Sequence, residues 1–363
     1  MPVPVQRDPQ VSRARLAEWL RPRLGNPRTL ELSELSVPSS GFSSETLLFD
    51  VSWFGKNGRQ QRELVARVAP TSHRVYPEDT FLLQYRIQEA LAADGTVPVP
   101  ALYGFEADPE ILGAPFFVME RVSGRVPGDF PSYHREGWLK ESSESVRKTL
   151  WNAALETLQR IHAIIPADLK TIFPGMDSGP STYCGVRREL TMYMRHLDFF
   201  SPADAPLAEQ VFQWLRSHVP DRTSQPDCLV WGDARIGNMV FSGDRVAAVL
   251  DWEMATVGPR EMDVAWFLYL DRHLSEGVGL PRLSGLPNRE QTVARYEELA
   301  GRTLNDLGYY DILAGFRFFL ITARVTSLSR RAGIVPPDSD FPLHRNATAL
   351  LRRTLSEYGV PVD

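Results

Sequence analysis

The chain has 363 residues, of which 43% are hydrophobic, and a formal net charge of -5. This length allows two domains or one large bilobal domain, and the negative charge without a long Lys/Arg run argues against a nucleic-acid partner. The two cysteines, Cys184 and Cys228, are too few for a disulfide framework or a zinc site. With no signal-peptide core and no run of eighteen apolar residues, we expect a cytoplasmic protein without a membrane partner.

The first third of the chain is rich in strand patterns. After a short predicted helix at residues 11–23, the segment "ETLLFDVSWF" alternates its side chains with a period of two. "RELVARVAP" resumes this pattern after an Asn57-Gly58 turn, which predicts a β-hairpin. A helix is predicted at residues 77–93, and two more strands are predicted in "ALYGFEA" and "PFFVMERV".

The remaining two thirds of the chain are mainly helical by periodicity. The composition changes near Ser123, so we predict an N-terminal region of residues 1–122 and a C-terminal region of residues 123–363. Helices are predicted at residues 143–165, 187–200, 288–300, 306–331 and 341–358. The fold class is therefore α+β, with an antiparallel β-sheet lobe followed by a mainly helical lobe.

The helical region is interrupted by a second predicted hairpin, over residues 238–251. "NMVFS" and "VAAVLD" are strand-like, and Gly243-Asp244 supplies the turn. A register symmetric about positions 244 and 245 places Asn238 opposite Asp251. An amide oxygen and a carboxylate so placed could ligate one Mg²⁺, with phosphates and water completing its shell.

Asp233 opens the loop "DARIGN" that leads into this hairpin. A carboxylate there can accept the proton of an attacking hydroxyl while a metal neutralises a transferring phosphoryl group. The spacing Asp-x-x-x-x-Asn, followed by a second Asp thirteen residues later, is typical of a kinase catalytic loop and metal-binding Asp.

The segments "WGDARIGN", "LDWEMA" and "GPREMDVAW" resemble the signature of the aminoglycoside phosphotransferase and choline kinase-type family. That family shares the bilobal protein kinase-like fold, and the chain looks most similar to the branch fused to acyl-CoA dehydrogenases. The resemblance implies transfer of the γ-phosphoryl group of ATP to a hydroxyl of a small molecule. It makes Asp233 the catalytic base and Asn238 and Asp251 the Mg²⁺ ligands, while Asp263 would support the catalytic loop.

The resemblance also implies a nucleotide site in the first lobe. Arg67 lies where kinases place a phosphate-binding lysine, although it could instead be a solvent-facing arginine on an edge strand. Backbone groups of Glu120 and Val122 would bind adenine. A loop that could cover the phosphates, or could be only a Ser-rich turn, comprises Ser40, Gly41, Phe42, Ser43 and Ser44.

Two departures from the family pattern keep an alternative open. Trp231 replaces a histidine, and an indole has one donor and no acceptor. Gln84 stands where a helix should offer a glutamate to pair with the cation of Arg67. The alternative is a catalytically degenerate kinase-fold protein that binds a nucleotide or metabolite. A protein kinase is less favoured, because no Asp-Phe-Gly to Ala-Pro-Glu segment follows "LDWE".

The sequence says little about the acceptor. A hydroxylated metabolite or hydroxyacyl compound is our preference over a polycationic aminoglycoside, and the aromatic-rich stretches at residues 183–200 and 308–319 are where we place its pocket. We interpret His162 as a packing residue at a helix end. The sequence gives no prediction of the oligomeric state.

Overall fold

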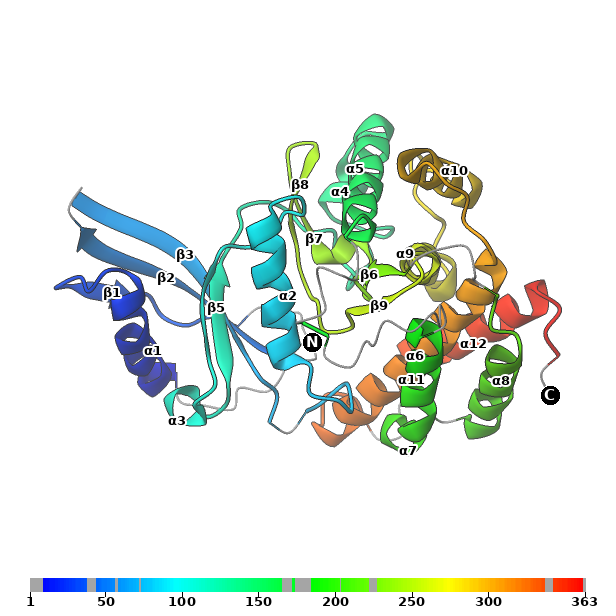
Figure 1. Cartoon of the computed structure of the whole chain (residues 1–363), viewed down its shortest axis with the longest axis horizontal. Coiled ribbons are helices and arrows are strands. Elements are labelled where there is room, and N and C mark those ends of the chain that lie inside the picture. The colour runs from blue at the N-terminus through cyan, green and yellow to red at the C-terminus, as the bar shows by residue number, and fades with distance from the viewer. Residues whose placement is uncertain are drawn as a thin grey trace. The chain divides into compact units, whose positions relative to one another are not determined.

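The computed structural model describes residues 9–37, 44–55, 58–71, 73–164, 172–173, 184–202, 204–221, 227–336 and 342–361. Contacts divide the chain into two compact units (Figure 1). Unit 1 runs to Gly95 and continues over Val99–Ser123, whereas unit 2 contains Thr96–Pro98 and everything from Gly124 onward.

Unit 1 is built around a five-stranded sheet in the order β1-β2-β3-β5-β4. Its named pairs are all antiparallel, and the predicted hairpin is confirmed, because Glu45 opposes Val68 and Gly55 opposes Gly58. The strands are β1 (Leu30–Leu32), β2 (Glu45–Gly55), β3 (Gly58–Val68), β4 (Leu102–Glu106) and β5 (Phe116–Glu120).

Helices cover both faces of this sheet, as Figure 1 shows for α1 (Pro9–Arg23) and α2 (Phe81–Asp94). Trp19 of α1 lies in a core with Phe116, whereas Phe81 of α2 packs with the next residue of the strand, Phe117. Since successive strand residues point to opposite faces, the two helices must lie on opposite sides. The short helix α3 (Pro109–Leu112) joins β4 to β5.

Unit 2 is mainly helical, as predicted, with short strands inserted at its centre (Figure 1). The strands are β6 (Cys228–Val230), β7 (Met239–Ser242), β8 (Arg245–Val249) and β9 (Thr256–Gly258). The α-helices are α4 (Trp138–Glu141), α5 (Glu144–His162), α6 (Cys184–Arg195), α7 (Leu197–Phe200), α8 (Ala205–Ser217), α9 (Glu261–Leu274), α10 (Arg289–Ala300), α11 (Leu307–Arg331) and α12 (Pro342–Glu357).

The core of unit 2 forms around α11, which packs against α9, α12, α8 and α7. The sequence contains no run of eighteen apolar residues, yet α11 is long and apolar enough on average to cross a membrane. However, 83% of its most apolar window is buried inside the protein, as expected of a core helix.

Several predicted boundaries move in the structure. The α2 helix begins at Phe81, whose N–H donates to Asp79 Oδ1, four residues later than predicted. The helix predicted at residues 187–200 is broken at His196 into α6 and α7. We did not predict α8, whose first turn is capped by the Asp204 carboxylate accepting from the Leu207 N–H at 3.1 Å.

Candidate active site

The hairpin formed by β7 and β8 is confirmed, but the register that we predicted for it is wrong. Its turn closes with Ser242 opposite Arg245, and a β-bulge further along shifts the pairing. The Leu250 N–H donates to the Asn238 carbonyl at 2.9 Å, so Leu250, not Asp251, follows the ladder opposite Asn238. Asp251 comes next, with a left-handed φ of 59° that favours short polar residues over bulky ones.

The loop that joins β6 to this hairpin is anchored by the buried carboxylate of Asp263. Its oxygens accept from the backbone N–H groups of Trp231 at 2.6 Å and Gly232 at 2.8 Å. His162 Nε2 lies 3.0 Å from the same carboxylate, and His162 Nδ1 lies 2.5 Å from the Tyr296 hydroxyl. Our interpretation of His162 as a packing residue was therefore incomplete. The sequence signal for these contacts was a histidine on the apolar face at the end of a helix. A buried imidazole there needs hydrogen-bond partners.

The side chain of Asp233, in this loop, is fixed by three donors. Its Oδ2 accepts from Asn238 Nδ2 at 2.6 Å and from Arg235 Nε at 3.0 Å, and its Oδ1 accepts from Trp266 Nε1 at 2.9 Å. The Asp233 side chain is 14% exposed. Sequence reasoning missed Arg235 and Trp266, although Trp266 follows Asp263 by three residues and so shares its helix face.

The amide of Asn238 is oriented by these contacts. Its Nδ2 faces the carboxylate and also the backbone carbonyl of Asp233, at 3.2 Å. Both partners are acceptors, so the amide must present its nitrogen to them and its oxygen elsewhere. Asn238 Oδ1 is therefore the atom that a cation could use.

Trp231, which replaces the family histidine, bonds to the strand end that carries Asp251. Its indole N–H donates to the carbonyls of Leu250 and Asp251, both at 3.0 Å, and its ring lies 5.9 Å from that of Trp252. The indole is buried and fixes the backbone around Asp251. It thus links the loop of Asp233 to Asp251 by hydrogen bonds as well as by packing.

Gly232 has a backbone conformation and a location that both require glycine. Its φ is +89°, and an added Cβ would lie 2.1 Å from the Met254 carbonyl oxygen. The loop can therefore approach the segment after β8 closely only without a side chain at this position.

A buried ion pair lies beside Trp266, in the stretches where we placed the acceptor pocket. Arg317 of α11 is 1% exposed, contacts Glu189 of α6 at 3.3 Å and lies over the Trp266 ring at 4.8 Å. Tyr193 packs into the same cluster, where burial raises the pKa of its hydroxyl to about 12. A charged group thus lies over the ring of the indole that donates to Asp233.

Most of the predicted phosphate-covering loop lies outside the described residues, namely Ser40, Gly41, Phe42 and Ser43. Ser44 is described and buried, directly before β2. The structure therefore leaves the anion-binding role of this loop as a prediction.

The other predicted nucleotide-binding residues lie in the sheet of unit 1. Arg67 is on the central strand β3, between β2 and β5, and not on an edge strand. The Glu120 N–H donates to the Ala101 carbonyl at 2.8 Å, so adenine could use the Glu120 carbonyl but not this N–H group. Val122 is the second residue after β5, and Gln84 is buried in α2.

Comparison with known proteins places this geometry in a family. The model of the phosphotransferase enzyme family matches residues 35–302. Over 311 residues the chain is 29% identical to Acyl-CoA dehydrogenase family member 11 of Pongo abelii, an alignment that covers 81% of this chain and 37% of that protein. The chain thus spans about a third of the length of the curated relatives it matches.

Solved structures show the same fold. A provisionally named aminoglycoside phosphotransferase of Ralstonia eutropha is 23% identical, with a TM-score of 0.69 and coverage of 96% of this chain and 99% of its own. The aminoglycoside phosphotransferase APH(4)-Ia, in complex with AMP-PNP and hygromycin B, is 17% identical with a TM-score of 0.55, covering 93% and 98% of the two chains. Both likenesses concern the fold.

Proposed function

This chain belongs to the phosphotransferase enzyme family, and from that premise we propose that it is an ATP- and Mg²⁺-dependent small-molecule kinase. It would move the γ-phosphoryl group of ATP onto a hydroxyl of a small molecule, releasing ADP. The observation that carries the proposal is the fixed carboxylate of Asp233, which orients the Asn238 amide, while Trp231 of the same loop holds the backbone of Asp251.

Asp233 is the proposed catalytic base. Its Oδ2 already accepts two hydrogen bonds, whereas Oδ1 accepts one, from Trp266. A carboxylate oxygen has room for about two donors, so Oδ1 is the atom that can take the acceptor hydroxyl. As the oxygen of that hydroxyl attacks the γ-phosphorus, its proton passes to Asp233, and the bond to the bridging oxygen of ADP breaks.

Asn238 Oδ1 and the carboxylate of Asp251 are the proposed Mg²⁺ ligands. The described residues contain no group of three or more His, Cys, Asp or Glu side chains that could form a complete protein cage. Mg²⁺ at nucleotide sites needs only one or two protein oxygens, because phosphates and water supply the rest, so this pair fits the ion. When bound, Mg²⁺ would neutralise charge on the phosphates.

ATP is the proposed phosphoryl donor. Arg67 would contact its phosphates, and the Glu120 carbonyl with the backbone of Val122 would hold adenine. Support comes from the position of Arg67 on the central strand β3 and from related structures in complex with AMP-PNP or GDP. A guanidinium can grip two phosphate oxygens, so an arginine can serve where related enzymes use lysine.

A hydroxylated metabolite, such as a hydroxyacyl compound, is the proposed acceptor. A polycationic aminoglycoside would require a dense acidic surface, yet the charged residues of α6 are mostly basic: Arg187, Arg188, Glu189 and Arg195. The matching curated relatives are named as acyl-CoA dehydrogenase family members, which suits an acyl-derived acceptor.

The second candidate is a degenerate protein that binds nucleotide without chemistry. The neutral, buried Gln84 favours it, since an ion pair with Arg67 is then impossible. Trp231 does not favour this alternative, because its indole N–H donates to the Asp251 carbonyl and so fixes the backbone there.

The kinase proposal is tested by adding ATP and Mg²⁺ to a metabolite extract and seeking, by mass spectrometry, a compound that gains a phosphoryl group. With that acceptor, Asp233→Asn should lower kcat by about 10² to 10⁴, the usual contribution of a general base. Nucleotide affinity should persist, because the base does not hold ATP.

Asp244→Asn is the matched control, since Asp244 is an exposed residue in the hairpin turn and should leave kcat unchanged. Full turnover by Asp233→Asn would contradict the assigned base. A wild-type protein that binds ATP but never consumes it would favour the degenerate alternative.

A further inference from the structure

Residues 125–134, at the start of unit 2, form a segment that we call the strap. At its first end, the backbone N–H groups of Arg125 and Phe241 each donate to the other residue's carbonyl at 2.9 Å, which ties the strap to β7. At its second end, Ser132 Oγ donates to the carbonyl of Leu274, the last residue of α9, at 2.7 Å. The strap thus joins the hairpin to the helix that anchors the loop of Asp233.

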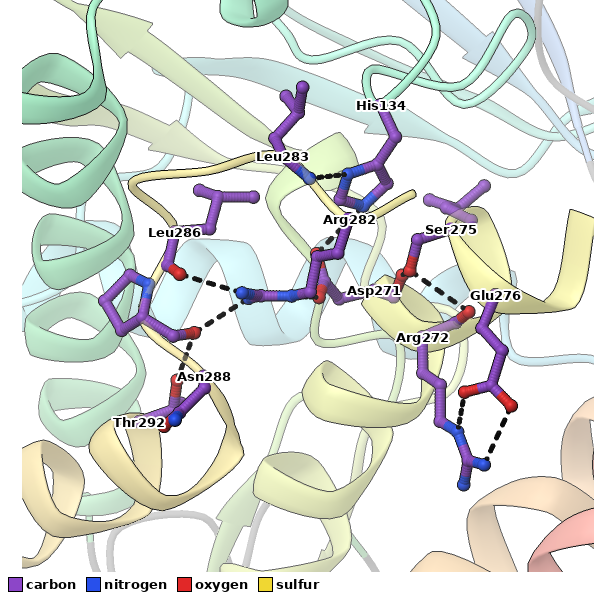
Figure 2. Close-up of polar contacts among 12 residues, drawn as sticks. His134, Asp271, Arg272, Ser275, Glu276, Arg282, Leu283, Leu286, Asn288 and Thr292 are labelled. Carbon is purple, nitrogen blue, oxygen red and sulfur yellow. Dashed lines mark hydrogen bonds and ion pairs between the residues drawn. The ribbon is translucent and has the colours of Figure 1, made fainter. Parts of the chain in front are cut away.

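A buried carboxylate, Asp271, fixes the second end of the strap. It accepts from Tyr133 Oη at 2.6 Å and Arg282 Nε at 2.6 Å, and His134 Nε2 lies 3.2 Å away. Figure 2 shows His134 and Arg282 converging on Asp271. His134 Nδ1 accepts from the Leu283 N–H at 3.1 Å, so the ring proton lies on Nε2 and faces the carboxylate.

The charge of Asp271 persists despite its burial. Burial alone would raise the pKa of this carboxyl, but the hydrogen bond from His134 and the charge of Arg282 outweigh burial and hold the pKa below its usual range. Arg282 is itself fixed, because its terminal nitrogens donate to the carbonyls of Leu286 and Pro287, both at 2.8 Å. The second end of the strap is therefore a satisfied, rigid network.

The middle of the strap contacts the loop of Asp233. Asp129 Oδ2 accepts from Arg235 Nη1, while Arg235 Nε donates to Asp233. Burial would lower the pKa of the Arg235 guanidinium, but the charges of Asp129 and Asp233 outweigh burial and raise it, so the group stays charged. A Cβ on Gly237 would lie 2.6 Å from Asp129 Oδ1, so a side chain at this position would displace the Asp129 carboxylate.

We propose that Asp129 is a positioning residue for phosphoryl transfer, a role that rests on the proposed function of this site. By holding Nη1, it fixes the Arg235 guanidinium in an orientation in which Nε donates to Asp233 Oδ2 and the Nε–Nη2 edge does not span both carboxylate oxygens. A guanidinium released from Asp129 can grip both carboxylate oxygens of Asp233 as a fork. That arrangement would occupy Oδ1, the oxygen assigned to the acceptor hydroxyl, and the strap prevents it.

The first test compares the steady-state kinetics of Asp129→Ala, Asp129→Asn and Glu136→Ala. Asp129→Ala should lower kcat by about 10²-fold, as expected for a misplaced catalytic group, with the KM for ATP unchanged. Asp129→Asn, whose side-chain oxygen still accepts from Nη1, should recover most of kcat. Glu136 is exposed and lies just beyond the strap, so Glu136→Ala controls for loss of one acidic charge and should match wild type.

A double-mutant cycle tests whether Asp129 acts through Arg235. In the Arg235→Ala background, Asp129→Ala should cause no further loss of kcat, because there is no guanidinium left to hold. Independent, multiplying losses would overturn the proposal, as would an unchanged kcat in a folded Asp129→Ala protein.

A readout without turnover separates this proposal from the proposed function. The indole N–H of Trp266 donates to Asp233 Oδ1, so its ¹H–¹⁵N resonance, assigned with Trp266→Phe, reports on that oxygen. The chemical shift of this resonance should change in Asp129→Ala and should change less in Asp129→Asn. In Glu136→Ala it should equal that of the wild type. A resonance that stays in place in both Asp129 variants overturns the strap's role. A moving resonance with no wild-type ATP consumption would support the positioning geometry and reject the kinase.

Discussion

Three buried or half-buried aspartates of unit 2 each accept hydrogen bonds from more than one donor. Asp263 accepts two backbone N–H groups, Asp233 accepts three side-chain donors, and Asp271 accepts from a tyrosine and an arginine. A carboxylate can serve several donors at once because each oxygen has two lone pairs. Removing one of these side chains would therefore leave several buried donors without an acceptor, and each costs about 1–3 kcal/mol.

His273 of α9 is a different kind of buried polar residue. It is 1% exposed, its ring lies 4.4 Å from that of Phe318, and within the described part of the chain neither ring nitrogen has a hydrogen-bond partner. Burial lowers its pKa from 6.5 to about 4. The native state therefore keeps the ring neutral at pH values where the unfolded chain protonates it.

This difference predicts a pH-dependent stability. Between pH 6.5 and about 4 the unfolded state binds the extra proton, so the free energy of unfolding should fall as the pH falls. The pKa difference corresponds to at most about 3 kcal/mol. Urea unfolding of wild type and His273→Leu from pH 4 to 7.5 measures this effect, and the variant should lose this slope. His218→Leu, at an exposed histidine, should keep it, and equal slopes in wild type and His273→Leu would refute the assignment.

At the scale of elements, α11 approaches two neighbouring helices closely at Gly315. An added Cβ would lie 3.0 Å from Leu351 Cδ1 and 3.0 Å from the Tyr269 hydroxyl. These residues belong to α12 and α9, so glycine at this position permits all three helices to pack together. The close packing of the three helices therefore offsets the low helix propensity of glycine at this position.

Gly315→Val should therefore destabilise the protein. Overpacking a buried site costs about 1–3 kcal/mol, which exceeds the gain of less than about 1 kcal/mol from replacing glycine in a helix. Chemical denaturation would measure the loss, with Arg331→Val at the exposed end of the same helix as the control. A variant as stable as wild type would show that the helices can move apart at no cost.

At the scale of the whole molecule, the proposed nucleotide site predicts ligand-dependent stability. ATP with Mg²⁺ at a hundred times its dissociation constant should stabilise the native state by about 2.7 kcal/mol. Asp251→Asn should lose the Mg²⁺-dependent part, because it removes a charged ligand while asparagine tolerates the left-handed backbone at this position. Differential scanning calorimetry with ATP plus Mg²⁺, ATP plus EDTA and neither measures the effect.

The controls for this measurement are chosen to isolate the metal. Asp244→Asn removes the same charge from the exposed turn of the same hairpin and should behave as wild type. An equal shift in EDTA would show that the nucleotide binds without the metal, and an unchanged Mg²⁺ effect in Asp251→Asn would remove Asp251 from the ligand set.

Local patterns in the sequence were sufficient for most of the elements and for the motifs. Period-two alternation predicted the β2–β3 hairpin, helical periodicity predicted α5, α10, α11 and α12, and the three motifs pointed to the phosphotransferase family. These features depend on residues close in sequence, whose backbone preferences and burial act locally. The predicted β7–β8 register failed because the turn is centred on Gly243 and Asp244, one position before the assumed centre, and the bulge recovers only half of that difference.

Only the tertiary structure decided which side chains hold the loop of Asp233. His162 meets Asp263 across 101 residues of chain, and Asp129 meets Arg235 across 106. Such partners have no spacing rule, because the packing of separate helices and of the strap brings them together. The sequence by itself therefore determined the family, the two-part architecture and the residues proposed for chemistry, while the fold determined the hydrogen bonds that orient them.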